Sequence, residues 1–317
     1  MPSEFELIAR YFVQRNEGES TGVALGAGDD CALLVPSSGQ QLAVSVDTSV
    51  VDVHFPAQAP AWAVGYRALA VSLSDLAAMG ARARWCTMAV TLPEADEAWI
   101  EAFSQGFHAL CAESGISLVG GDVTRGGLSI SVTVHGEVPA GAALCRNGGK
   151  AGDIVAVTGP LGGGHGGLVA WQQGMRDLAD PLLSRYLLPK PRLSAGLVLR
   201  GLANCAIDIS DGLLADLNHL CEASHLGAEL DMERLPLATG LEDLLGGEGA
   251  RHAALCGGDD YELLFSLPEA FLTEAQRRLR ECSLDLWPIG RLHAGAGITG
   301  VDEIAASGWQ HFPGGAS

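Results

Sequence analysis

The stretch CAIDISDGLLADLNHLCEAS (205–224) decides the fold class, because it reads as a strand, an acidic turn and a helix in immediate succession. The run up to Asp208 is short and apolar, as in a buried strand. From Leu213 onward leucines recur at helical spacing. The same alternation extends in both directions along the chain, which predicts an α/β (α+β) protein.

Hydrophobic periodicity predicts the other elements. In the first half we expect helices over 5–14, 61–81 and 96–115, a Gly turn running into a strand over 26–35, and strands over 41–50, 84–92, 116–124 and 128–138. In the second half we expect strands over 153–159, 228–237 and 287–293, a helix opening at 167–174, a proline-entered helix over 188–201 and a helix near 269–282. The Gly/Ala-rich segment 139–151 has no apolar period, so we predict two domains, 1–138 and 139–317.

Composition excludes several classes of function. The 317 residues contain 19 Lys+Arg and 38 Asp+Glu, a formal net charge of −19, which argues against binding to nucleic acid or to anionic membranes. The eight cysteines form no CxxC motif, so neither a zinc site nor a disulfide framework is predicted. The start of the chain has no signal-peptide pattern, and we expect a soluble cytoplasmic protein.

Aspartates repeatedly follow apolar runs. They are Asp29 and Asp30 after GAG, Asp47, Asp122, and the pair Asp208 and Asp211, while Asp75 lies on a mostly apolar helix. Taken singly, each is most simply a turn residue or a helix N-cap. Taken together, they predict a metal site, because buried carboxylates need partners and basic residues are scarce. Ligation by oxygen atoms alone suits Mg²⁺. Several Mg²⁺ ions usually accompany a polyphosphate substrate.

Three further features leave alternatives open. Gly162, Gly164 and Gly167 match a dinucleotide-binding fingerprint, but the expected downstream acidic residue is missing. That turn either holds a phosphate with its amides or is a plain tight turn. His54 either contacts a ligand or is structural. The chain contains neither a P-loop motif nor protein-kinase motifs, so bound ATP would need another kind of site.

An ordered set of motifs resembles the thiamine-monophosphate kinase family. The motifs are GDDCA (28–32), SVDTSVVDVHF (45–55), SLSDLAAMGA (72–81), GGDVTR (120–125), VTGPLGG (157–163), YLLPKPRLSAG (186–196), DISDGLLADL (208–217) and GGDDYELLF (257–265). The resemblance implies a two-domain fold like that of aminoimidazole-ribonucleotide synthetase. In that fold N-terminal strands form a homodimer interface, the first domain binds ATP and Mg²⁺, and the second closes the site. The implied reaction transfers the γ-phosphoryl of ATP directly to thiamine monophosphate, without a general base.

The resemblance also implies roles for individual residues. Metal ligands would be Asp30, Ser45, Asp47, Asp75, Asp122, Asp208 and Asp211. ATP would contact Gly121, Asp122, Arg146 and Ser210, and thiamine monophosphate would contact His54, Asp259 and Trp309. Two positions depart from the family pattern: Val46 replaces a common hydroxyl residue, and Asp259 stands where the family usually has glutamate.

Relatives within the superfamily are the main alternatives. Selenophosphate synthetase would have a reactive Cys or Sec near the N-terminus, and residues 1–25 contain no Cys. The hydrogenase-maturation relative would end in Cys, whereas this chain ends GGAS. The purine-synthesis relative shares the ATP cleft but not the combination of DISDGLLADL and GGDDYE. Outside the superfamily, a nicotinamide oxidoreductase would rest on 162–167 alone, and a non-catalytic metal-binding protein would use the carboxylates without ATP.

Overall fold

The computed structural model describes residues 4–13 and 22–301, and the chain divides into two compact units. Unit 1 consists of the residues up to Leu76 together with Ala81–Ala143. Unit 2 consists of Ala77–Gly80 together with the residues from Leu144 onward. The change from one unit to the other after Ala143 lies inside the segment 139–151.

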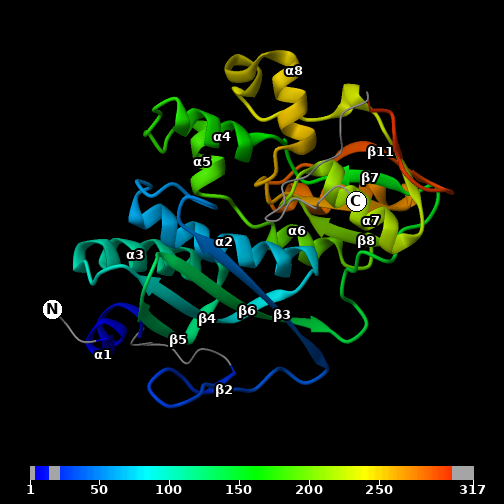
Figure 1. Ribbon diagram of the computed structural model, residues 1–317. Helices are drawn as coiled ribbons and strands as arrows, with labels where there is room; N and C mark the ends of the chain where they lie inside the picture. The colour runs from blue at the N-terminus through cyan, green and yellow to red at the C-terminus, as the bar shows by residue number, and fades with distance from the viewer. Residues whose placement is uncertain (1–3, 14–21, 302–317) are drawn as a thin grey trace, which may run out of the picture. The chain divides into compact units, whose positions relative to one another are not determined.

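Unit 1 is built on a four-stranded sheet in the order β3-β6-β4-β5. Its strands are β3 (Gln40–Val50), β4 (Arg82–Leu92), β5 (Ser117–Arg125) and β6 (Ser129–Pro139). In this sheet β4 and β5 are parallel, and the other two pairs are antiparallel. Helices α2 (Ala61–Ala78) and α3 (Glu97–Ser114) lie over one face of this sheet (Figure 1). The N-terminal part adds α1 (Glu4–Leu7), the π-helical turn η1 (Ile8–Phe12), β1 (Val23–Leu25) and β2 (Leu33–Leu34).

Two glycines allow α2 and α3 to pack backbone against backbone. A Cβ on Gly106 would lie 1.8 Å from the carbonyl oxygen of Trp62, and one on Gly65 would lie 2.0 Å from that of Phe103. Helix α3 begins where the sequence predicts a helix, and the Asp96 carboxylate caps it by accepting hydrogen bonds from the amides of Ala98 and Trp99. It ends at Gly115, whose φ of 69° is left-handed. The helix layer over the sheet therefore depends on glycine at two positions.

We expect Gly106→Ala to lower the free energy of unfolding by about 1–3 kcal/mol, because the added methyl group must push two backbones apart. Urea denaturation followed by circular dichroism measures the change. Gly127→Ala is the matched control, since a Cβ there meets nothing within 4 Å. Equal stability of the two variants would contradict the close helix contact.

Unit 2 contains a six-stranded sheet in the order β12-β9-β11-β7-β10-β8. Its strands are β7 (Ile154–Val157), β8 (Cys205–Asp208), β9 (Gly227–Leu230), β10 (Leu263–Leu267), β11 (Trp287–His293) and β12 (Ile298–Thr299). Its helices are α4 (Gly163–Gln172), α5 (Pro181–Leu187), α6 (Leu193–Leu199), α7 (Leu213–Ser224), α8 (Leu241–Cys256) and α9 (Leu272–Glu281), with the short turns η2 (Met232–Arg234) and η3 (Glu269–Phe271). In this sheet β9 and β12 are parallel, and the other neighbouring pairs are antiparallel.

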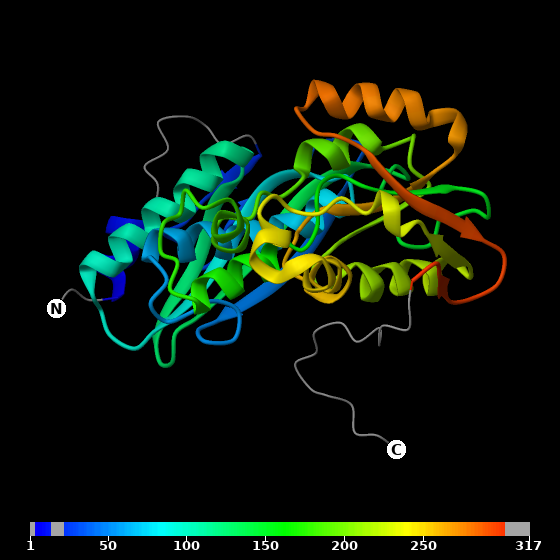
Figure 2. The same ribbon diagram turned by 90° about the horizontal axis from the view of Figure 1, so that it is seen from above.

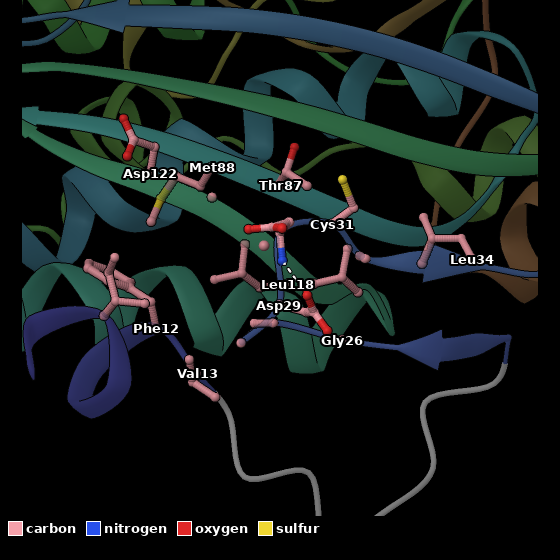
Figure 3. Close-up of a pocket in the computed structure, with 18 of the residues that line it drawn as sticks. Phe12, Val13, Gly26, Asp29, Cys31, Leu34, Thr87, Met88, Leu118 and Asp122 are labelled. Atoms are coloured by element: carbon pink, nitrogen blue, oxygen red, sulfur yellow. Dashed lines mark hydrogen bonds between the residues drawn. The ribbon is translucent and has the colours of Figure 1, made fainter. Parts of the chain in front are cut away.

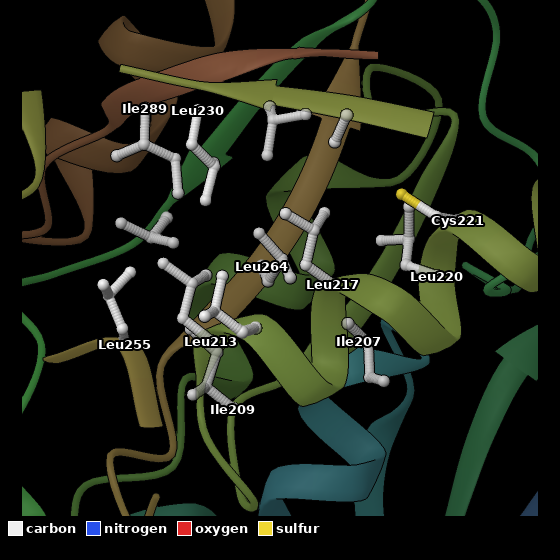
Figure 4. Packing of buried hydrophobic residues seen from close by; sticks show 14 of the residues in the cluster. Ile207, Ile209, Leu213, Leu217, Leu220, Cys221, Leu230, Leu255, Leu264 and Ile289 are labelled. Atoms are coloured by element: carbon white, nitrogen blue, oxygen red, sulfur yellow. The ribbon is translucent and has the colours of Figure 1, made fainter. Parts of the chain in front are cut away.

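Strands β7, β8 and β10 of the unit 2 sheet are buried on both faces. Val155 and Leu264 point into a cluster built with leucines of α7 (Figure 4). The neighbouring Ala156 and Phe265 point the other way, into a cluster with α6 and α9. Figure 2 shows the yellow-green α7 and the orange α9 on opposite sides of the strands. This explains why β7, β8 and β10 are mostly apolar and do not alternate with polar residues.

Three helical segments of unit 2 differ from the prediction. The proline-entered helix predicted over 188–201 is present but shorter: α6 begins only at Leu193, because Pro189 and Pro191 interrupt the backbone hydrogen bonding before it. Helix α5, which starts at Pro181, was missed. Helix α8 was also missed, because glycines break its apolar pattern and Gly246 has a non-helical φ of 71° within it. Among the described helices, none has both the length and the apolar composition needed to cross a membrane.

Candidate functional site

Strand β3 and helix α2 bring three of the predicted metal ligands together in unit 1. Ser45 and Asp47 are two residues apart on β3, so their side chains share a face. The Ser45 hydroxyl donates a hydrogen bond to the carboxylate of Asp75 on α2. Burial, followed by the negative charge of Asp75, raises the pKa of Asp47 to about 6. The charge of Asp75 therefore lies close enough to oppose the ionisation of Asp47.

This group fits a hard divalent cation. The Oδ2 atom of Asp47 is buried and has no hydrogen-bond partner, which is unusual for a carboxylate and is relieved by a bound ion. The donors are all oxygens, as Mg²⁺ prefers. Across residues 4–13 and 22–301, no three Asp, Glu, His or Cys side chains lie close enough to enclose a metal. A partial set suits Mg²⁺, which usually keeps waters and takes further oxygens from substrate phosphates.

A second group of predicted residues lines a pocket of about 720 Å³ in unit 1 (Figure 3). Its acidic part consists of Asp29, Asp30 and Asp122, and its apolar part includes Phe12 and Leu118. Glycine is required at position 121 of the pocket wall, because a Cβ there would lie 2.0 Å from the carbonyl oxygen of Met88. The pocket therefore combines an apolar surface suited to a ring with carboxylates suited to cations.

Strand register separates these two groups. Asp122 pairs with Ala89, which pairs with Ser131, and Ser131 pairs with Thr48. Residues paired in this way project from the same face of a sheet, and Thr48 is the neighbour of Asp47. Asp122 and Asp47 thus project from opposite faces. The ligands predicted in unit 1 form two groups rather than a single shell around one ion.

In unit 2, the turn after β8 is organised by a carboxylate that the sequence reasoning missed. Asp216 Oδ2 accepts the backbone amides of Ser210 at 3.0 Å, Asp211 at 3.2 Å and Gly212 at 3.2 Å. Burial, then the charges of Asp208 and Asp211, raises the pKa of Asp216 to about 7. The sequence did contain a signal for this role of Asp216, because the residue lies in the first turn of α7, directly after an acidic turn.

The segment GGDDYE (257–262) lies alongside this turn. The amide of Asp259 donates to the Ser210 carbonyl, and the amide of Tyr261 donates to the Ile209 carbonyl, both at 2.8 Å. The predicted metal ligand Asp208, the predicted ATP contact Ser210 and the predicted substrate contact Asp259 are therefore neighbours within unit 2. The tertiary fold joins two motifs that are about fifty residues apart in the sequence.

The glycine-rich turn before α4 is held from inside the protein. The amides of Gly162 and Gly164 donate to the two carboxylate oxygens of Asp260, at 2.8 and 3.1 Å. Both amides already have a carboxylate partner, so the structure favours a tight turn over a phosphate cradle at these two positions. Beside it, Glu262 is fully buried and accepts hydrogen bonds from Arg192 and Thr158.

Burial raises the pKa of Asp260 to about 7, against the opposing effect of the two amides. Because this folded pKa exceeds the unfolded value near 3.8, the associated stability is present below pH 3.8 and is lost as the pH rises through 7. We expect Asp260→Asn to lower the free energy of unfolding by about 1–3 kcal/mol, because asparagine has one side-chain oxygen to accept hydrogen bonds from the two amides where aspartate has two. The stability difference between wild type and variant should narrow from pH 4.5 to pH 8, as measured by urea denaturation at each pH. A widening difference would contradict this assignment.

Three other predicted residues have simpler surroundings. The Nδ1 atom of His54 accepts the amide of Val50 at 3.0 Å, so this ring also stabilises the end of β3. Arg146 is exposed, and its carbonyl accepts a hydrogen bond from the Ser224 hydroxyl. Trp309, predicted to contact the substrate, lies outside the described residues.

Comparison with known proteins assigns the family. A model described as "AIR synthase related protein, N-terminal domain" matches residues 28–138, and its C-terminal counterpart matches residues 150–303. The thiamine-monophosphate kinase of Haemophilus influenzae is 39% identical over 321 residues, covering 98% of both chains. That of Escherichia coli K12 is 48% identical over 270 residues, covering 84% of this chain and 83% of its own. The chain belongs to the thiamine-monophosphate kinase family.

Solved structures of family members agree with this fold. The thiamine-monophosphate kinase of Stenotrophomonas maltophilia K279a is 47% identical with a TM-score of 0.84, covering 89% of this chain and 92% of its own. The structure "AaThiL complexed with AMPPCP and TMP" is 32% identical with a TM-score of 0.79, covering 88% and 89%. The hydrogenase maturation protein HypE in complex with ATP, at 22% identity and a TM-score of 0.76, shares the fold alone.

Proposed function

We propose that this protein transfers the γ-phosphoryl group of ATP to thiamine monophosphate, releasing ADP and thiamine diphosphate. A phosphate oxygen of thiamine monophosphate forms a bond to the γ-phosphorus as the bond to the ADP oxygen breaks. The observation that carries the proposal is the 39%-identical thiamine-monophosphate kinase that spans 98% of both chains. The alternative is another ATP-using reaction of the same superfamily.

The acceptor needs little activation, because a phosphate monoester is already ionised near neutral pH. Positioning and charge neutralisation then carry the reaction, with no general base. We assign Mg²⁺ binding in unit 1 to Ser45, Asp47 and Asp75, and to the pocket residues Asp30 and Asp122. In unit 2 we assign it to Asp208 and Asp211. Bound Mg²⁺ would neutralise phosphate charge, to which a chain with 19 Lys+Arg against 38 Asp+Glu contributes few basic side chains.

The remaining assignments concern the two substrates. We assign ATP contacts to Gly121, Asp122, Arg146 and Ser210, and thiamine monophosphate contacts to His54 and Asp259. We place the reaction in the cytoplasm, where cysteines stay reduced; none of the eight forms a disulfide in the described structure.

The decisive experiment supplies purified protein with MgATP and thiamine monophosphate and measures thiamine diphosphate by chromatography. Unphosphorylated thiamine and an aminoimidazole-ribonucleotide precursor are parallel substrates. Product from the monophosphate alone supports the proposal. Stabilisation by ATP in a thermal-shift assay without product would move the function to another member of the superfamily.

Asp47→Asn should lower kcat by at least about 100-fold, since even residues that only support a metal ligand cost 10–100-fold when replaced. The fold should persist, because the substitution removes the repulsion from Asp75. Asp285→Asn is the control, since Asp285 is exposed and lies outside the assigned site. EDTA should abolish wild-type activity and Mg²⁺ should restore it. Wild-type turnover by the Asp47→Asn variant would overturn the metal assignment.

We further propose that the enzyme is a homodimer that pairs through β3. This strand is at the edge of its sheet, and Leu42, Val44 and Val46 are 44%, 55% and 59% exposed on one face. An exposed apolar edge strand promotes association unless a partner covers it. A second copy of the chain would cover it symmetrically.

Val44→Lys and Val46→Lys should each shift the protein toward monomer in sedimentation velocity, because two charges would be buried per dimer. Val53→Lys, at a position that is 50% exposed in the turn after β3, should leave the mass unchanged. A wild-type protein that is monomeric at all concentrations tested would refute the dimer.

A further inference from the structure

Tyr261 and Asp259 form a hydrogen-bonded pair within the segment 257–262. The Tyr261 hydroxyl donates to Asp259 Oδ1 at 2.8 Å. The tyrosine is 8% exposed, so packing holds it in place, whereas Asp259 is only partly buried. The well-buried tyrosine thus supports an aspartate that is partly accessible.

The backbone of Asp259 is fixed from several directions. Its amide and that of Tyr261 are bonded to the turn after β8. Between them, Asp260 is bound to the amides of Gly162 and Gly164. Both Asp259 and Tyr261 have left-handed φ values, 60° and 51°, which only such restraint maintains.

With its backbone fixed, the carboxylate of Asp259 retains only its side-chain torsions. A Cβ on Gly164 would lie 2.7 Å from the Cβ of Asp259, so the start of α4 packs closely against the base of this side chain. The bond to Tyr261 then fixes the plane of the carboxylate itself. Aspartate has fewer torsions to restrain than glutamate, so one hydrogen bond suffices to orient it.

We propose that Tyr261 is a positioning residue that orients the Asp259 carboxylate toward thiamine monophosphate and thereby sets the affinity for this substrate. The inference rests on the proposed function and on the assignment of Asp259 to substrate contact. Thiamine monophosphate carries a cationic thiazolium ring and an amino group on its pyrimidine, and a carboxylate recognises both by charge and hydrogen bonding. Tyr261 acts through Asp259, so its effect belongs to substrate binding and not to phosphoryl transfer.

The test measures steady-state kinetics with thiamine monophosphate varied at saturating MgATP for Tyr261→Phe, Asp259→Asn and the double variant. We expect Tyr261→Phe to raise KM for thiamine monophosphate about tenfold, the usual consequence of losing a hydrogen bond to a charged group. Its kcat and its KM for ATP should stay within about twofold of wild type. The double variant should match Asp259→Asn alone, because the tyrosine has no further effect once the carboxylate is gone.

Tyr66→Phe is the matched control, since Tyr66 donates a similar hydrogen bond to Glu113 in unit 1, away from the assigned residues. Thermal melts establish that each variant is folded, and calorimetric titration with thiamine monophosphate in the absence of ATP measures affinity independently of turnover. An unchanged KM in Tyr261→Phe, a fall in kcat alone, or additive effects in the double variant would each overturn the inference. Absence of thiamine diphosphate formation by wild type would instead overturn the proposed function itself.

Discussion

Repulsion between carboxylates held close together is the constraint on which both units depend. An acidic chain with few basic residues must satisfy most of its buried carboxylates by means other than ion pairs. In unit 2, Asp216 and Asp260 accept hydrogen bonds from backbone amides, whereas Glu262 has an arginine, Arg192, as its partner. In unit 1, the Ser45 hydroxyl donates a hydrogen bond to the Asp75 carboxylate. The buried Oδ2 atom of Asp47, by contrast, has no hydrogen-bond partner. The difference separates carboxylates that hold the fold from the carboxylates that we propose as cation ligands.

The amide-bound carboxylates explain how unit 2 organises its loops. The Asp216 carboxylate accepts hydrogen bonds from three successive amides of the turn after β8. The Asp260 carboxylate accepts hydrogen bonds from two amides of the glycine-rich turn. The segment 257–262 connects the two turns through its backbone hydrogen bonds. Asp259 therefore occupies a defined position although its own side chain is partly exposed. The structure supplies rigid support around a residue that we assign to the substrate.

Sequence reasoning succeeded where local patterns decide the structure. Strands β3, β4 and β6 and helices α2, α3 and α7 were predicted to within a few residues, since each has strong periodicity or a clear end signal such as Gly115. It failed at α5 and α8, where prolines and glycines hide the pattern. By motif it proposed Asp47, Asp75 and Asp259 as site residues, but it missed the residues that organise the surroundings of Asp259, namely Asp216, Asp260 and Tyr261. A supporting residue is defined by what it contacts, and those contacts are long-range or depend on loop geometry.

The sequence by itself determined the two-domain α/β organisation, the acidic character of the chain and the kinase family, because these depend on composition, periodicity and ordered motifs. The tertiary structure alone decided which carboxylates meet. Register places Asp122 and Asp47 on opposite faces of one sheet, and the pairing of residues 209–210 with 259–261 joins two distant motifs. The physical reason is that a side chain's partners depend on strand pairing and loop closure between distant segments, which no local pattern encodes.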